Sequence, residues 1–179
     1  MAAPGDVYER ELKYILSGDG KVIEKMIKTC SEEEASAYRS MEETPFMVVR
    51  AAGSLGVDLI ALRWDFSFPI EVKSSGDNVL HFSRSPRLGE QADTMREECG
   101  KSHLLPIYAY RLKKNGSNIK GDPWRIFCLP TDDNLRGAAG LLQRRIPTMY
   151  RGPSGNLIMK WEEGMKLSDF IRYTNMMEE

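Results

Sequence analysis

The spacing of apolar residues predicts a helix at the start of the chain. Tyr8, Leu12, Ile15 and Leu16 recur every three or four positions, which is the period of an amphipathic helix. Asp6 is a candidate N-cap, with Glu9 three residues later as in a capping box. The polar, glycine-containing segment 17–20 ends this helix.

Residues 18–44 are predicted to form one or two further short helices. Val22, Met26 and Ile27 give a second apolar stripe, and Ser31 followed by three glutamates is typical of a helix start. Pro45 ends this region.

From residue 46 onward the pattern changes to short apolar runs separated by turn residues, which predicts strands. Strands are expected at 46–49, 57–62, 69–73, 104–112 and 124–129, with a helix over 88–99. Beyond these, short helices and a small hairpin are expected at 136–145, at 157–161 and from Ser168 onward. This order predicts an α/β fold, in which helices flank a mixed central β-sheet.

The length of 179 residues fits a single domain over 1–179, with 18–44 as a helical insertion and 152–179 as a C-terminal extension. Hydrophobic residues make up 41% and charged residues 28% of the chain, as in soluble globular proteins. No apolar run reaches the length of a membrane span, and no signal peptide is visible, so we expect a cytoplasmic protein. Cys30, Cys99 and Cys128 lie far apart, which disfavours a disulfide framework or a zinc site.

The charge is unevenly distributed along the chain. The formal net charge is −1, yet residues 79–151 hold 13 Lys/Arg against 7 Asp/Glu. Such an asymmetry is compatible with a phosphate-facing surface, although charges of this kind often only solvate a face.

The segment with the clearest chemistry runs from Asp58, at the start of one expected strand, to Glu71 and Lys73 on the next. Residues i and i+2 of a strand share a face, so Glu71 and Lys73 project together while Ile70 and Val72 point into the core. If the two strands pair as a hairpin, Asp58 reaches the same face.

Two carboxylates suit a hard divalent cation such as Mg²⁺, with Mn²⁺ as a substitute. A cation beside a lysine is a minimal arrangement for hydrolysis of a phosphodiester. Glu-x-Lys alone is common on solvated strand faces, and an aspartate at a strand start is often a turn residue. The conjunction of an Asp flanked by Gly56, an apolar strand and Glu-x-Lys between apolar residues favours a catalytic site.

These segments resemble the archaeal Holliday junction resolvases, within the restriction-endonuclease-like PD-(D/E)xK nucleases. The resemblance covers most of the chain outside 18–44. The segments that carry it are Tyr8-Glu-Arg-Glu-Leu12, Val48-Val-Arg-Ala-Ala-Gly-Ser54, Val57-Asp-Leu-Ile-Ala61, Ile70-Glu-Val-Lys-Ser74 and Glu90-Gln-Ala92.

The resemblance implies a restriction-endonuclease-like core and a set of site residues. Glu9, Asp58 and Glu71 would be metal or water ligands, and Lys73 the catalytic lysine. Ser54 would lie near the scissile phosphate and Gln91 close to the site.

The sequence departs from the family in three ways. Val57 stands where a proline is frequent, the early segment is acidic, and the connection to the first strand is longer by roughly 25 residues. Periodicity does not choose between Glu9 and Glu11, which flank the apolar arc of the first helix on opposite sides. Glu9 has an alternative role as a capping residue.

Arg10, Arg50, Arg84 and Arg87 are candidates for contacts with DNA phosphates, with a solvated surface as the alternative for each. Lys101 is a similar candidate. Lys113, Lys114 and Lys120 lie on an expected hairpin tip, which would serve as a DNA clamp or only as a polar loop. Trp64 and Trp124 are predicted to belong to the core.

The function that these expectations favour is a magnesium-dependent endonuclease that cuts branched DNA, above all four-way junctions. The family and the need for two symmetric cuts imply a homodimer. One alternative is a DNA repair nuclease of the same fold that acts on other branched or duplex DNA. Another is a DNA-binding module without catalysis.

Overall fold

Six strands form the central sheet, in the order β1-β2-β3-β5-β6-β9. The computed structural model describes residues 4–52, 54–113 and 119–177. The strands are β1 (Met47–Arg50), β2 (Leu59–Leu62), β3 (Phe68–Ser75), β5 (Ile107–Leu112), β6 (Trp124–Cys128) and β9 (Met165–Lys166). β3 and β5 are parallel, and the other neighbours are antiparallel. The predicted mixed sheet is therefore confirmed.

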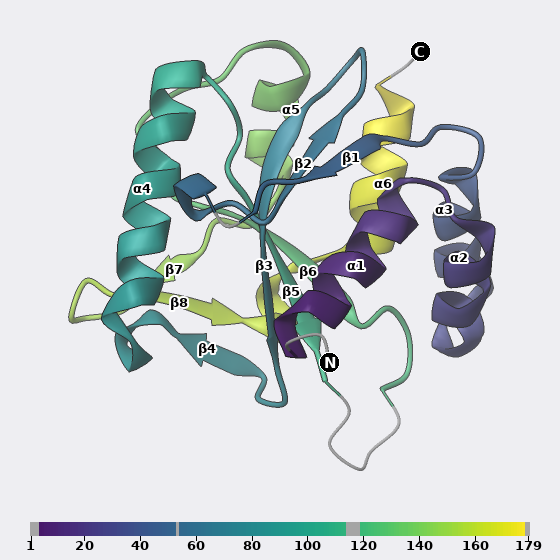
Figure 1. Cartoon of the computed structure of the whole chain (residues 1–179), viewed down its shortest axis with the longest axis horizontal. Helices are drawn as coiled ribbons and strands as arrows, with labels where there is room; N and C mark the ends of the chain where they lie inside the picture. The colour runs from purple at the N-terminus through teal and green to yellow at the C-terminus, as the bar shows by residue number, and fades with distance from the viewer. Residues whose placement is uncertain (1–3, 53, 114–118, 178–179) are drawn as a thin grey trace.

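Helices cover both faces of this sheet (Figure 1). On one side lie α1 (Pro4–Leu16), α2 (Gly20–Met26), α3 (Glu32–Ser40) and α6 (Leu167–Met176). On the other lie α4 (Pro86–Ser102) and a small sheet of β4 (Val79–His81), β8 (Leu157–Lys160) and β7 (Tyr150–Arg151). α5 (Gly137–Arg145) and the short 3₁₀ helices η1 (Ile27–Thr29), η2 (Ser54–Gly56), η3 (Phe82–Arg84) and η4 (Trp161–Glu163) complete the described elements.

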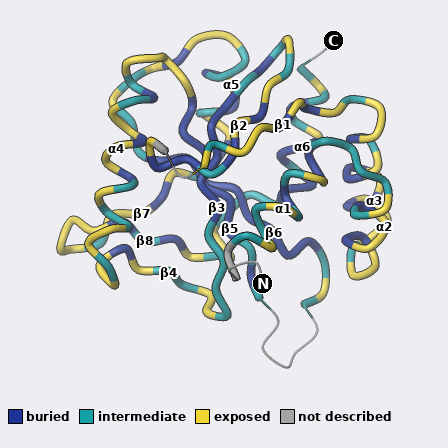
Figure 2. The backbone as a smooth tube through the Cα atoms, viewed as in Figure 1, coloured by how far each residue is buried: buried dark blue, intermediate teal, exposed yellow. Residues whose placement is uncertain are grey.

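The sheet separates two hydrophobic clusters, and β5 shows how one strand serves both. Ile107 and Ala109 belong to the cluster under α1, α3 and α6, whereas Tyr108 and Tyr110 belong to the cluster under α4. This alternation follows from the two-residue period of a strand. All four residues are fully buried, and Figure 2 shows the buried chain concentrated along the central strands.

Of the two N-caps predicted for the first helices, one is present in the structure and one is not. Ser31 is the N-cap of the predicted helix start, and it forms a capping box that was not predicted there: its hydroxyl accepts from the Glu34 amide at 3.2 Å, and the Glu34 carboxylate accepts from the Ser31 amide at 2.9 Å. Asp6 is not an N-cap, because α1 already begins at Pro4. The Asp6 carboxylate instead accepts hydrogen bonds from Arg10 and Arg50.

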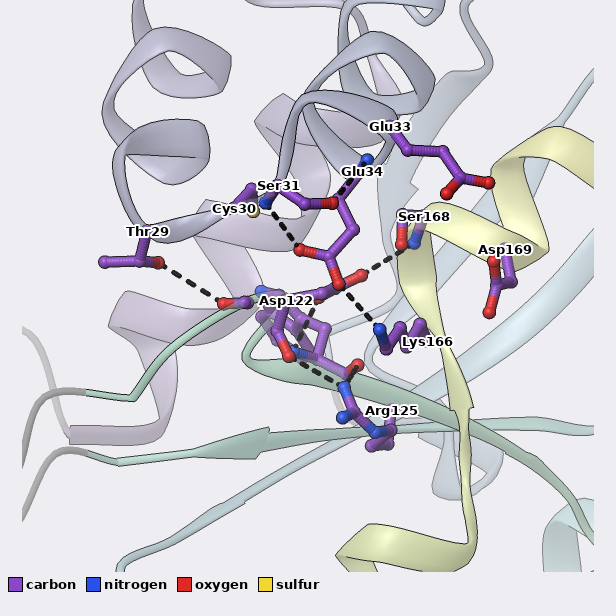
Figure 3. A network of polar contacts seen from close by, with 12 residues as sticks. Thr29, Cys30, Ser31, Glu33, Glu34, Asp122, Arg125, Lys166, Ser168 and Asp169 are labelled. Atoms are coloured by element: carbon purple, nitrogen blue, oxygen red, sulfur yellow. Dashed lines mark hydrogen bonds and ion pairs between the residues drawn. The ribbon is translucent and has the colours of Figure 1, made fainter.

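Two glutamates of the acidic run of α3 pair with basic side chains of the C-terminal segment. Glu34 accepts from Lys166 at 2.8 Å, as Figure 3 shows, and Glu33 pairs with Arg172 on α6. The helices of 18–44 therefore pack against the C-terminal segment, and two of the three acidic side chains have basic partners there.

Asp122 lies at the centre of this contact and is 1% exposed. Its carboxylate accepts from the Tyr38 hydroxyl at 2.7 Å, the Trp124 amide at 2.9 Å and the Ser168 amide at 2.7 Å. One buried carboxylate thus joins α3, the start of β6 and the first turn of α6.

The two tryptophans that were predicted to be core residues differ. Trp124 is fully buried, as predicted. Trp64 is 82% exposed in the turn between β2 and β3, so that prediction was wrong. Trp64 lies in the short connection between two strands, outside the part of the hairpin that packs into the core. Within the described ranges, none of the helices combines the length and the hydropathy needed to cross a bilayer.

Candidate active site

Asp58 is held at the start of β2 by the antiparallel pairing of β2 with β3. Its amide donates to the Ile70 carbonyl at 3.0 Å, which continues the hairpin ladder by one residue. Its carboxylate accepts from the Val72 amide at 2.8 Å. The Asp58 side chain therefore reaches across to the part of β3 that carries Glu71 and Lys73, as the sequence predicts.

Glu71 and Lys73 share one face of β3. Ile70 and Val72 belong to the cluster on the opposite face, which confirms the predicted alternation. The Lys73 ammonium donates to the Glu71 carboxylate at 2.6 Å. The Lys73 side chain retains 15% exposure, whereas that of Glu71 retains 3%.

The charge state of Glu71 reflects this environment. Burial raises its pKa to about 7, the Lys73 ammonium lowers it, and the neighbouring Asp58 carboxylate raises it. Two carboxyl groups are thus close enough to repel each other in a buried place, and one lysine only partly offsets that repulsion.

Gln91 comes to this group from α4. Its side-chain oxygen accepts from Lys73 at 3.3 Å. The approach of α4 requires Gly56, because a Cβ at that position would lie 2.5 Å from the Gln91 carbonyl oxygen, and the φ of Gly56 is +65°. Ala52 and Leu55 also have positive φ, so the loop before Asp58 holds conformations that L-residues seldom adopt.

The donor chemistry of this cluster fits a magnesium ion. Asp58 and Glu71 offer carboxylate oxygens, and Mg²⁺ is usually held by one or two carboxylates together with water and phosphate. In the described ranges there is no group of three or more His, Cys, Asp or Glu side chains placed to hold a metal. The pair fits a hard cation that keeps much of its hydration, and not a site enclosed by protein ligands.

Glu9 is not brought into this pair. Its carboxylate accepts from Arg50 at 2.9 Å, and Arg50 also contacts Asp6. Glu11, the alternative on the other side of the helix, accepts from Arg111 at 2.8 Å and from the Trp124 indole at 2.9 Å. Glu11 thus ties α1 to β5 and β6, while Glu9 lies toward β1, near the start of β2.

The remaining predicted residues lie around the site to different degrees. Ser54 begins η2, but its side chain lies outside the described residues. Arg84 is exposed just before α4 and pairs with Asp77. Arg87 is exposed in the first turn of α4. Arg10 is exposed and pairs with Asp6. Of the expected lysines on the hairpin tip, Lys114 lies outside the described residues.

Tyr108 is a residue that the sequence did not single out. It is the register partner of Glu71 on β5, it is fully buried, and its hydroxyl has no hydrogen-bond partner among the described residues. The alternation of Ile107-Tyr-Ala-Tyr110 indicates that the two tyrosines share a face. It does not indicate which strand lies beside them.

Comparisons with known proteins give likenesses to solved structures and none at the level of sequence families. No protein-family model matches the sequence, and no curated protein matches it either. Among solved structures, the chain is similar to Hjc from Archaeoglobus fulgidus, a Holliday junction resolvase from an archaeal hyperthermophile, with a TM-score of 0.46 and 16% identity. The match covers 82% of this chain and 99% of that chain.

Proposed function

We propose that this protein is a magnesium-dependent DNA endonuclease that cuts four-way junctions. The observation that supports this most directly is the convergence of Asp58, Glu71 and Lys73 on one face of the β2–β3 hairpin. The same three residues are among those that carry the sequence resemblance to the archaeal resolvases with their restriction-endonuclease-like core. Their geometry suits hydrolysis of a phosphodiester and requires neither a redox group nor a covalent nucleophile.

In this proposal Asp58 and Glu71 hold the cation. A bound Mg²⁺ supplies Lewis-acid polarisation of the phosphate and lowers the pKa of an attacking water. The Lys73 Nζ lies 2.6 Å from the Glu71 Oε1. The Lys73 ammonium is therefore placed to orient that water or to stabilise charge on the phosphate. Gln91 positions Lys73 through the 3.3 Å contact. Ser54 is proposed to contact the phosphate, and Glu9 to join the ligands once Arg50 turns toward DNA.

The DNA backbone is proposed to contact the arginines around the site. Arg87 is the simplest candidate, because it is exposed in the first turn of the helix that carries Gln91. Arg10, Arg50 and Arg84 have acidic partners, which DNA phosphates would have to replace. Such contacts position a duplex without reading its sequence, so the selectivity would rest on the shape of the branch.

A second copy of the chain would supply the matching cut on the opposite strand. The β1–β2 hairpin has an exposed apolar face suited to such a contact, composed of Met47, Val49, Ile60 and Leu62. β1 is also an edge strand of the sheet.

The deciding experiment compares cleavage of a labelled four-way junction, a flap and a linear duplex, each with Mg²⁺ and with EDTA. The proposal expects cation-dependent, paired cuts in the junction and little cutting of the duplex. Equal cutting of all three substrates would reject the four-way junction as the preferred substrate and would favour a repair nuclease of broader range. Binding of the junction without cutting in either Mg²⁺ or Mn²⁺ would favour a non-catalytic module.

A further inference from the structure

The hydroxyl of Tyr108 is an unusual group in this fold. The side chain is fully buried, yet its hydroxyl has no hydrogen-bond partner among the described residues. A buried donor without a partner loses its hydrogen bonds to water and gains nothing in return, so such groups are rare in native proteins. A partner that arrives with a ligand would satisfy this hydroxyl.

The surroundings of Tyr108 indicate which ligand. Tyr108 and Glu71 are direct register partners on parallel strands, so they lie side by side on the face under α4. Burial raises the pKa of Tyr108 well above its usual value, and the Glu71, Asp58 and Asp93 carboxylates add to this rise. The hydroxyl is therefore a neutral donor on a side chain that lies beside Glu71, within the electrostatic reach of both proposed cation ligands.

The packing around the ring holds this hydroxyl in place. The Phe82 ring centroid lies 5.8 Å from that of Tyr108, and Met95 and Ala92 of α4 belong to the same buried cluster. A side chain confined in this way cannot turn toward solvent to find a partner.

The next tyrosine on the same strand shows what a satisfied hydroxyl looks like. Tyr110 is the register partner of Lys73 and is equally buried, and its hydroxyl donates to the Asp77 carbonyl. Two tyrosines, two positions apart on one face, thus differ mainly in whether the folded chain supplies an acceptor.

We propose that Tyr108 is a positioning residue for the cation, whose hydroxyl donates its hydrogen bond to the Glu71–Asp58 pair once a divalent cation is bound. Without the cation, Glu71 is engaged by Lys73 at 2.6 Å. When both carboxylates are ionised around a cation, a buried neutral donor beside them forms a charge-assisted hydrogen bond. This inference rests on the proposed function, because it concerns the same site.

The test measures cation binding to the full chain in the absence of DNA. Mn²⁺ is titrated by calorimetry into the wild type, Tyr108→Phe, Tyr110→Phe and Asp58→Asn. Loss of a group that orients a metal ligand typically weakens metal binding by about 10-fold or more, so Tyr108→Phe should raise the Kd by about 10-fold. Tyr110→Phe should leave the Kd unchanged, and Asp58→Asn should remove binding.

Thermal unfolding of the metal-free variants gives the second readout. Tyr108→Phe removes an unpartnered hydroxyl, so its Tm should be unchanged or higher, whereas Tyr110→Phe loses a hydrogen bond and its Tm should fall. In cleavage assays, excess cation should restore the kcat of Tyr108→Phe, because the defect lies in affinity. A purely structural role for Tyr108 predicts the reverse: a lower Tm and an unchanged Kd.

The outcomes separate the two proposals. If the wild type binds Mn²⁺ and cuts DNA while Tyr108→Phe binds with the same Kd, the positioning role is overturned and the nuclease proposal stands. If the wild type itself binds neither Mn²⁺ nor Mg²⁺, both are overturned.

Discussion

Glu71 and Asp122 are both buried carboxyl groups, with exposures of 2% and 1%, but their surroundings are opposite. Asp122 accepts three hydrogen bonds from three elements, and no carboxylate is among these partners. Glu71 has one close cation, Lys73, and a second carboxylate, Asp58, beside it.

The difference teaches how to distinguish a structural from a functional buried charge. Around Asp122 the folded chain supplies three donors that lower the pKa of this carboxyl, although burial still raises it overall, and the group joins α3, β6 and α6. The Tyr108 hydroxyl near Glu71 and the Ser168 hydroxyl near Asp122 both have no hydrogen-bond partner within the described ranges, so that feature does not separate the two places. What separates Glu71 is the second carboxylate beside it, an arrangement that a bound cation would stabilise.

The largest expected effect is the loss of DNA cleavage when a carboxylate of the candidate site is replaced. Asp58→Asn or Glu71→Gln should reduce junction cleavage by at least about 10³-fold, because each removes a proposed ligand of the cation. Binding of junction DNA in a gel-shift assay should persist, since these groups hold the cation and not the backbone. Glu90→Gln, an exposed neighbour of Gln91 on α4, is the control and should cut normally. If both site variants lose folding together with activity, their roles are structural.

Asp122→Ala should have the largest effect on stability. It leaves the Tyr38 hydroxyl and the amides of Trp124 and Ser168 without their acceptor, which we expect to cost about 4 kcal/mol of unfolding free energy. Urea denaturation measures this loss, and Asp132→Ala, at an exposed position, is the control. Cleavage per folded molecule should not change. A loss below about 1 kcal/mol would contradict the structural role of Asp122.

The pH dependence of stability should also reveal the raised pKa of Glu71. In metal-free protein the pKa of Glu71 is raised from 4.5 to about 7, so the folded state binds the proton more tightly than the unfolded state. The contribution of Glu71 is fully present below pH 4.5 and is lost as the pH rises through about 7, by about 3 kcal/mol at most. Urea titrations in EDTA should show this fall, and Glu71→Gln should abolish it. An identical pH profile in the variant would contradict the assignment.

The same contrast explains what the sequence could predict. Asp58, Glu71 and Lys73 lie within one hairpin, so strand alternation and local pairing were enough to bring them together. The partnership of Tyr108 with Glu71 depends on the register of two parallel strands joined through α4, which no local pattern specifies. The hydrogen bond from Tyr38 to Asp122 spans 84 residues of sequence. Hence the acidic run of α3 could be recognised as a helix start, but not as the partner of Lys166 and Arg172.

The smallest expected effect concerns the rim of the Asp122 network. Lys166 pairs with Glu34 at 2.8 Å, but its side chain is 44% exposed, so water screens the pair. Lys166→Met should therefore lower the unfolding free energy by less than about 1 kcal/mol, as measured in urea. Adding salt should weaken the wild type only slightly, because an exposed pair contributes little to begin with. A loss as large as that of Asp122→Ala would mean that the contact between α3 and the C-terminal segment depends on the ion pair at its edge instead of the buried carboxylate at its centre.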